Sequence, residues 1–330
     1  CCVHRHGDRT PVTTTLAYST DPEALAALSE PYGYGQLTDA GKRTAYSLGQ
    51  FIRTRYDGLL SEKYNRSEIY IRSTDSTRTR MTVLTALAAI YPAASDNWSD
   101  DVNWTPVPYT TVPARYDFVM NCPPFISAYY SSFLKTSPAM DSYTDALNTW
   151  SEYLSFNITQ LPVMAYPVYD VYTSQLMRIS IPMFSSLKYC IVIPLFTGVL
   201  LNEFFTYADL VISGEDTPRV RIYSAHDVNV FAFEAVTQIA PRQGVPKYGS
   251  MYGLELRKIL ETGEYVVLPT YLSSPSSEEV TYLQVAGCDS LLCGIDQFRE
   301  ITSSYVLDES TWRTECGLTD DAVIDTSSID

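Results

Sequence analysis

The sequence predicts an α/β fold, a three-layer sandwich with a mainly parallel central sheet and a helical cap domain inserted in the chain. Strand and helix patterns alternate in the first third of the sequence and return in its last third, as in a sheet covered by helices. The stretch between them has helical patterns without a clear strand. The 330 residues are 45% hydrophobic, enough for a large core and two structural units. We therefore expect an α/β domain of residues 1–120 and 205–330, and a helical cap of residues 121–204.

The first third of the chain predicts two strands and three helices. The chain starts in a strand, and Pro22 opens a short helix because proline is tolerated in a first helical turn. Thr38 is the N-cap of a helix that reaches Arg55. Residues 67–72 alternate like a strand, and the helix that follows is capped by Asp75 or Ser76 and ends at Pro92. This last pair is a βα unit.

The insert and the last third of the chain show different secondary-structure patterns. Two segments of the insert fit helices, Asp141–Phe156 and Val171–Ile179. After the insert we expect a strand over Arg219–Ser224 and a helix over Val228–Ile239. A hairpin follows, formed by Tyr252–Leu260 and Glu264–Leu272 and turning at Thr262-Gly263. The alternation of strand and helix therefore resumes where the α/β domain continues.

Charge and hydropathy exclude two classes of partner. Lys and Arg number 23 against 38 Asp and Glu, a net charge of −15, so nothing global attracts a nucleic acid. The excess of carboxylates is typical of a solvated surface. The longest apolar run, Tyr189–Leu201, is interrupted by Pro194 and is too short for a bilayer, so we expect a buried segment and no membrane span.

Cysteines and glycosylation sequons favour an exported protein. A pair spaced as Cys288 and Cys293, followed by a distant third cysteine, is typical of a disulfide framework. A zinc site would need a second close pair or a nearby histidine, and no histidine follows His226, so we expect no metal. The pairing of Cys1, Cys2 and Cys190 stays open. Asn-x-Ser/Thr sequons, the acceptors for N-linked glycans, stand at Asn65, Asn97, Asn103 and Asn157.

The run Arg5-His6-Gly7-Asp8-Arg9-Thr10-Pro11 holds the clearest chemistry. It follows the first predicted strand, so its side chains lie at the carboxyl edge of the sheet, where open α/β folds bind ligands. Arginine forks match phosphate oxygens, and positive charge beside a histidine lowers its pKa and keeps the ring neutral and nucleophilic. Glycine allows a close backbone approach, and Pro11 stiffens the exit.

Two further motifs also follow predicted strands. His226-Asp227 stands between a strand and a helix, and Asp227 is a natural proton donor for the leaving oxygen of an alcohol. Arg72 ends another strand and adds a third guanidinium at the same edge. Simpler interpretations exist for each residue. His6 is then a loop histidine, Asp227 only an N-cap and Arg72 half of an ion pair. For His4 we favour a packing role on the strand and leave it out of the site.

Together these motifs resemble the histidine acid phosphatases, a branch of the histidine phosphatase superfamily, and most of all the prostatic and lysosomal acid phosphatase group. The resemblance covers most of the chain. It rests on ordered segments: Arg5–Pro11, Gly35–Thr38 with Leu48-Gly49, Tyr70–Asp75 with Arg78-Thr79, Gly198–Glu203, Tyr223–Asp227, Gly287–Cys293 and Thr314–Cys316.

The resemblance implies phosphomonoester hydrolysis through a phosphohistidine. His6 then attacks phosphorus and Asp227 protonates the leaving group. The non-bridging oxygens are held by Arg5, Arg9, Arg72 and His226. Neither metal nor other cofactor is implied, because the arginines neutralise the phosphate charge. The resemblance further implies disulfides Cys122–Cys316 and Cys288–Cys293, a homodimer, and a secreted or lysosomal setting.

Other functions on the same scaffold stay open. Substrates of the main interpretation are small phosphomonoesters, and phosphoproteins are a second class. A phytase-like enzyme would want more basic residues around the pocket than this acidic chain provides. A mutase-like enzyme would work near neutral pH, and a secreted, catalytically silent binding protein would not need every catalytic position to be filled.

Overall fold

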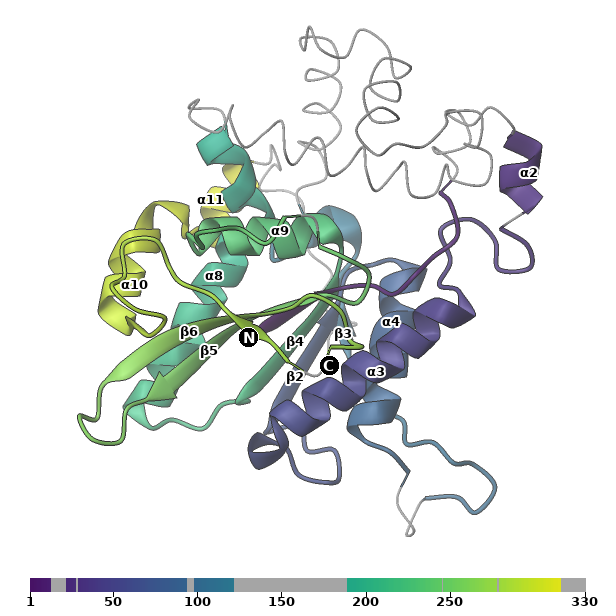
Figure 1. Cartoon of the computed structure of the whole chain (residues 1–330), viewed down its shortest axis with the longest axis horizontal. Coiled ribbons are helices and arrows are strands. Elements are labelled where there is room, and N and C mark those ends of the chain that lie inside the picture. Colours follow the sequence, from purple (N-terminus) through teal and green to yellow (C-terminus); the bar gives the residue numbers. More distant parts are fainter. Residues whose placement is uncertain are drawn as a thin grey trace, which may run out of the picture.

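The protein is described here by a computed structural model covering residues 1–12, 22–27, 29–93, 98–121, 189–244, 246–277 and 279–315. Its centre is one mixed sheet in the order β3-β2-β4-β1-β5-β6-β7, with β8 paired to β6 (Figure 1). The strands are β1 Cys2–Arg5, β2 Ile69–Ser73, β3 Thr110–Thr111, β4 Val220–Ala225, β5 Met251–Lys258, β6 Tyr265–Leu272, β7 Thr281–Tyr282 and β8 Cys293–Gly294.

The strand directions explain why the site forms where it does. β1, β2 and β3 all run parallel to their neighbours on the β4 side, so their carboxyl ends share one edge. β5 and β6 add an antiparallel hairpin beside β1. The hairpin turns at Gly263, whose φ of 77° is the left-handed conformation that favours glycine. The expected mainly parallel sheet and the expected hairpin are confirmed.

Helices cover both faces of the sheet. α3 and α4 pack with the core on one face, and α8, α9 and α10 lie with the core on the other (Figure 1). The three-layer arrangement of the prediction is therefore confirmed. The helices are α2 Pro22–Ala27, α3 Asp39–Arg55, α4 Thr77–Ile90, α8 Tyr189–Ser213, α9 Asp227–Val236, α10 Ile295–Thr302 and α11 Glu309–Glu315, with short 3-10 turns at Asp57–Leu59, Ala114–Tyr116 and Ser303–Tyr305.

Side-chain caps fix where α3 and α4 begin. The Thr38 hydroxyl accepts the N–H of Gly41, as the sequence predicts for an N-cap. Of the two alternatives for α4, Ser76 is the cap, because its hydroxyl accepts the N–H of Thr79. Capping satisfies backbone donors that a first helical turn leaves unpaired, so both helices start at fixed residues.

Helix α8 is longer than the apolar run from which the sequence predicted that no segment could cross a bilayer. The apolar stretch does not stop at Leu201 but continues as one helix, and Pro194–Ser213 is long and apolar enough to cross a bilayer. Half of that stretch is buried inside the protein, and α8 packs along α9, so it serves as a core helix. The predicted boundary between residues 204 and 205 falls inside this helix.

Several predictions fall outside the described residues. The two helical segments of the insert do, as do Cys122, Cys316 and the sequons at Asn97 and Asn157. Asn65 and Asn103 lie in described, exposed segments.

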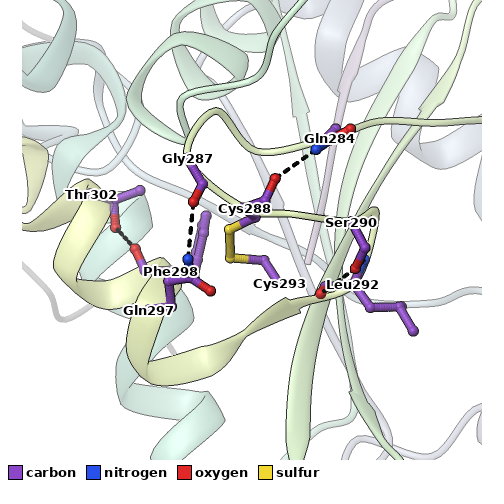
Figure 2. The surroundings of a disulfide bond; sticks show 9 residues. All are labelled: Gln284, Gly287, Cys288, Ser290, Leu292, Cys293, Gln297, Phe298 and Thr302. Atoms are coloured by element: carbon purple, nitrogen blue, oxygen red, sulfur yellow. Dashed lines mark hydrogen bonds between the residues drawn. A yellow bond between two sulfur atoms is a disulfide. The ribbon is translucent and has the colours of Figure 1, made fainter.

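The disulfide between Cys288 and Cys293 is present (Figure 2). It closes the turn that leads into α10, where the Gln284 amide donates to the Cys288 carbonyl. Cys1 and Cys2 are free, and Cys2 is buried.

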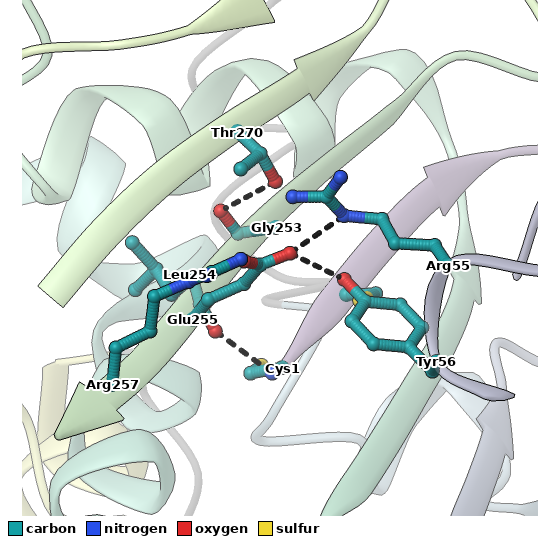
Figure 3. A network of polar contacts seen from close by, with 9 residues as sticks. Cys1, Arg55, Tyr56, Gly253, Leu254, Glu255, Arg257 and Thr270 are labelled. Carbon is teal, nitrogen blue, oxygen red and sulfur yellow. Dashed lines mark hydrogen bonds and ion pairs between the residues drawn. The ribbon is translucent and has the colours of Figure 1, made fainter. Parts of the chain in front are cut away.

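A polar network ties α3 to β5 beside the first strand (Figure 3). The carboxylate of Glu255 accepts hydrogen bonds from Arg55 at 2.7 Å and from the Tyr56 hydroxyl at 3.1 Å. Arg257 pairs with the other oxygen at 2.5 Å. Three donors compensate the burial of this carboxylate, and their net effect is to lower the pKa of Glu255.

Candidate active site

The pairing of β1 with β4 brings the two predicted motifs together. Arg5 is the register partner of Ala225, so the residues that follow each strand leave the sheet side by side. The His6 N–H donates to the Ala225 carbonyl at 3.0 Å. The rings of His6 and His226 then lie with their centroids 5.5 Å apart. Neighbouring strand ends therefore place both histidines in one site, as the sequence predicted.

Glycine at position 7 lets the His6 loop rest directly on helix α3. A Cβ atom on Gly7 would lie 2.3 Å from the carbonyl oxygen of Gly41, and one on Gly41 would lie 2.1 Å from that of Asp8. The Thr38 hydroxyl donates to the Asp8 carboxylate at 2.6 Å and holds the loop there. Backbone contact of this kind excludes any side chain, so the glycine is needed for close approach.

The orientation of the His6 ring leaves one nitrogen ready for attack. Nδ1 lies 2.7 Å from the carbonyl oxygen of Gly7, and a carbonyl only accepts, so Nδ1 carries the proton. Nε2 then keeps its lone pair. A backbone hydrogen bond that fixes the tautomer is what a nucleophilic imidazole requires.

Burial and positive charge keep His6 uncharged. The ring is buried, and this burial lowers the pKa of His6 well below its ordinary value, with the charges of Arg78 and Arg5 adding to the effect. The pKa of His226 is lowered in the same way, by burial first and then by Arg78, Arg5 and Arg9. Both rings therefore stay neutral in mildly acidic solution.

His226 is held by partners from two elements. Its Nδ1 lies 3.3 Å from the Arg78 guanidinium, which only donates, so Nε2 carries the proton and donates to the Thr74 hydroxyl at 3.1 Å. Its backbone N–H donates to the side chain of Asn229 at 3.2 Å. The ring is thus fixed at the start of α9.

Asp227 and Arg5 form an ion pair at the mouth of the site. The Asp227 carboxylate lies 3.1 Å from the Arg5 guanidinium, and Asp227 is partly exposed while Arg5 is buried. The other Asp227 oxygen accepts the N–H of Val228 at 2.9 Å. This places a carboxyl group beside a guanidinium that can bind an anion, where the carboxyl can exchange a proton with a bound ester.

Arg9 is buried at the same edge. Its guanidinium donates to the carbonyl of Thr10 at 2.9 Å, and residue 9 forms a backbone bridge with Leu37. Its charge is one of those that lower the pKa of His226. Arg5, Arg9 and Arg78 therefore surround the histidine pair with three guanidinium groups.

Comparison with known proteins agrees with this geometry. The model of the histidine phosphatase superfamily (branch 2) matches residues 1–159. The human prostatic acid phosphatase is 30% identical over 95% of this chain and 86% of its own length. The bovine lysosomal acid phosphatase is 30% identical over 96% of this chain and 79% of its own length. The chain belongs to the histidine phosphatase superfamily, branch 2.

Solved structures agree on the fold of this histidine phosphatase. The apo form of a Hafnia alvei phytase matches with a TM-score of 0.58 over 96% of both chains, at 15% identity. A Citrobacter braakii phytase matches with a TM-score of 0.56 over 96% of this chain and 98% of its own, at 12% identity. At this level of identity the likeness establishes the fold alone.

Arg72 takes a different place from the one predicted for it. Its guanidinium forms an ion pair with Asp117 at 2.5 Å, and both side chains are buried. It also lies 5.9 Å from the ring centroid of Phe118. The simpler interpretation, an ion pair with an acidic neighbour, describes this residue, because β2 directs the side chain toward the segment after β3.

Arg78 was missed as a site residue, although a signal existed. It stands in the first turn of α4, and side chains in a helix point back toward its amino end, here toward the sheet edge. Arg78-Thr79 was already among the segments that carry the family resemblance. The sequence could not show which of two arginines, Arg72 or Arg78, turns into the site.

We expect Arg78 and Arg72 to differ sharply when each is replaced by alanine. Arg78→Ala should lower kcat/KM for 4-nitrophenyl phosphate by about a hundredfold, because one charged donor to the phosphate is lost. Arg72→Ala should instead cost about 3 to 5 kcal/mol of stability, because Asp117 is left buried without its partner. Steady-state kinetics and urea unfolding measure both. A catalytic loss as large for Arg72→Ala as for Arg78→Ala, in folded protein, would restore Arg72 to the phosphate site.

His4 is a packing residue, as expected. It is fully buried on β1, its Nδ1 lies 3.2 Å from the carbonyl of Arg5, and burial lowers its pKa to about 4. Within the described ranges no group of three or more His, Cys, Asp or Glu side chains is arranged to hold a metal ion.

Proposed function

We propose that this chain is an acid phosphatase that hydrolyses phosphomonoesters through a covalent phosphohistidine on His6. One observation carries the proposal. The His6 ring is neutral, has Nδ1 bound to a backbone carbonyl and is surrounded by Arg5 and Arg78, with Asp227 beside them. Phosphoryl transfer needs little beyond positioning and charge stabilisation, and this arrangement offers both. Membership of the histidine phosphatase superfamily and likeness to acid phosphatases support the same activity.

In the first step the lone pair of His6 Nε2 attacks phosphorus. The bond from phosphorus to the alcohol oxygen breaks, and the proton of the Asp227 carboxyl passes to that oxygen, so the alcohol leaves neutral. Arg5, Arg9 and Arg78 hold the non-bridging oxygens, and His226 joins them when its Nε2–H turns from the Thr74 hydroxyl to the phosphate. Binding of phosphate draws Arg5 from Asp227, since the guanidinium serves both.

In the second step water attacks the phosphohistidine. The Asp227 carboxylate takes a proton from this water, the new oxygen–phosphorus bond forms, and the bond from phosphorus to Nε2 breaks. Inorganic phosphate leaves, and His6 returns to its neutral form. Asp227 has regained the proton that the next cycle needs, so the two steps close with one water consumed.

The protonation states that this mechanism requires of His6 and Asp227 predict a pH optimum below neutrality. His6 must be neutral, and its lowered pKa keeps it so in acid. Asp227 must carry a proton in the first step. Activity on aryl phosphates should therefore fall as the pH rises toward 8.

The substrate class is small phosphomonoesters, with phosphoproteins as a second candidate. The phytase-like alternative has support from the fold alone. A polyphosphate substrate would need more cations than 23 Lys and Arg in a chain of net charge −15 readily supply. The mutase-like and silent-binding alternatives have no observation in their favour.

A secreted or lysosomal setting fits this activity. The relatives include prostatic and lysosomal acid phosphatases. The Cys288–Cys293 disulfide is typical of an oxidising or exported environment. N-linked glycans at the sequons and a homodimer belong to the same proposal.

Trapping the intermediate tests the mechanism. The reaction with a 32P-labelled aryl phosphate is quenched within milliseconds, and the protein is digested under alkaline conditions. The label should be found on His6 and should be released by acid. Label on a serine or aspartate, or turnover without any labelled protein, would contradict a phosphohistidine.

A further inference from the structure

Helix α9 carries a buried carboxyl group that the proposed mechanism does not use. Glu234 lies two helical turns after Asp227 and is 0% exposed. Its Oε2 accepts the backbone N–H of Gln243 at 3.2 Å, and within the described residues Oε1 has no hydrogen-bond partner. A buried carboxyl with one unmatched oxygen is costly, which calls for a reason beyond packing.

Gln243 belongs to the α9–β5 connection, of which residues 237–244 and 246–250 are described. This connection forms one wall of the active site. The Pro246 carbonyl accepts a hydrogen bond from the Arg5 guanidinium at 2.8 Å. The Tyr248 ring lies 4.0 Å from the centre of that guanidinium and 5.7 Å from the His6 ring.

The connection also binds the backbone of the catalytic loop. The Gly249 N–H donates to the His6 carbonyl at 3.1 Å, and the Arg5 N–H donates to the Ser250 carbonyl at 2.9 Å. Any shift of the connection therefore moves Arg5, which is bound to it by both backbone and side chain. On the α9 side, the hydrogen bond from Gln243 to Glu234 fixes the same segment.

We propose that Glu234 is a positioning residue for Arg5: by accepting the Gln243 N–H it fixes the α9–β5 connection, whose Pro246 carbonyl and Tyr248 ring orient the phosphate-binding guanidinium. This inference rests on the proposed function, because it concerns the same anion site. Glu234 itself touches neither His6 nor Arg5 in any contact described above. It acts along the chain through the two residues, 244 and 245, that separate Gln243 from Pro246.

The protonation state of Glu234 suits an enzyme that works in acid. Burial raises the pKa of Glu234 to about 8, and the Gln243 N–H and Arg242 offset this only in part. Tyr252 on β5 and Tyr271 on β6 face the same group, and Glu234 contributes to the raised pKa of each. The carboxyl is therefore neutral in acid, so that it occupies the interior without charge. Above pH 8 the carboxylate needs hydration, which requires the connection to move.

The sign of the effect on stability follows from the raised pKa. The unfolded chain releases this proton above the ordinary pKa of 4.5, whereas the folded chain keeps it up to about 8. The unfolded state thus binds fewer protons in this range, and stability decreases as the pH rises from about 4.5 to about 8. A glutamine at this position removes that decrease.

Phosphate binding by full-length variants tests the positioning role. At pH 5 we expect Glu234→Ala to weaken the Kd for inorganic phosphate by about tenfold and to raise KM for 4-nitrophenyl phosphate similarly, with a smaller change in kcat. Glu234→Gln should bind phosphate like the wild type, because its amide oxygen still accepts the Gln243 N–H. Val236→Ala is the matched control, since it removes buried methyl groups from the same helix and keeps the carboxyl group that accepts the Gln243 N–H.

Two results would overturn the proposal: an unchanged Kd in Glu234→Ala, or an equal loss in Val236→Ala. If Glu234→Ala does not fold, Gln243→Pro removes the donor N–H from the other side and should weaken phosphate binding in its place. Thermal unfolding gives an independent measure. Between pH 5 and pH 8.5 the wild type should lose more stability than Glu234→Gln, and parallel losses would contradict a titrating Glu234.

The proposed function and the role of Glu234 fail in different ways. A wild-type chain that neither binds phosphate nor hydrolyses esters overturns the function, while the unfolding comparison still decides on Glu234. A wild-type chain that does both, with Glu234→Ala equal to it, overturns the role of Glu234 alone.

Discussion

Replacing His6 with alanine is expected to lower kcat for 4-nitrophenyl phosphate by at least about ten thousandfold, because the proposed nucleophile is lost. The three guanidinium groups remain, so the variant should still bind inorganic phosphate. It should form no labelled phosphoenzyme. Steady-state kinetics, phosphate titration and rapid quench together measure these three quantities in one preparation.

His4→Leu is the matched control for this variant. His4 is a buried histidine two residues away on β1, and leucine fills its place with an apolar side chain of similar size. Its kcat should stay within a few fold of the wild type once folding has been checked by circular dichroism. Substantial turnover in His6→Ala, or a loss of the same size in His4→Leu, would mean that His6 is not the nucleophile.

Replacing Asp227 with asparagine is expected to slow poor leaving groups far more than good ones. Asparagine keeps an oxygen for the Val228 N–H but has no acidic proton to transfer to the leaving alcohol. For an alkyl phosphate, whose alcohol must be protonated as it leaves, kcat should decrease by about a hundred to ten thousandfold. For 4-nitrophenyl phosphate the loss should be much smaller. A plot of log kcat against the pKa of the leaving alcohol should therefore be steeper for Asp227→Asn than for the wild type.

Asp8→Asn provides the comparison for Asp227→Asn. It makes the same change of carboxylate to amide in the catalytic loop, where the Asp8 carboxylate accepts the Thr38 hydroxyl. Any loss there should be equal for both kinds of substrate, because Asp8 has no role in protonation. If Asp227→Asn slowed substrates with good and poor leaving groups equally, Asp227 would not be the general acid.

The sequence by itself predicted the strands and helices of the first third, the strand, helix and hairpin after the insert, and the histidines and Asp227 that we propose for catalysis. Thr38 caps its helix through a local hydrogen bond, and the hairpin turns at Gly263, whose left-handed φ favours glycine. His6 and His226 directly follow β1 and β4, so a parallel sheet was enough to bring them to one edge. These features depend on neighbours in the chain, or on one simple rule of topology.

Only the tertiary structure decided which distant side chains meet. Arg72 and Arg78 are both near the end of β2, and the position of Asp117 after β3 turns one away while the helical start of α4 directs the other to His226. The apolar length of α8 is compatible with a membrane and with a core, and only the structure shows that half of Pro194–Ser213 is buried and that α8 packs along α9. No local motif marks Glu234 in the sequence. Its hydrogen bond from Gln243, and the hydrogen bond from Arg5 to Pro246, both depend on how the α9–β5 connection folds. Long-range contacts of this kind depend on the packing of the whole chain, which local patterns do not encode.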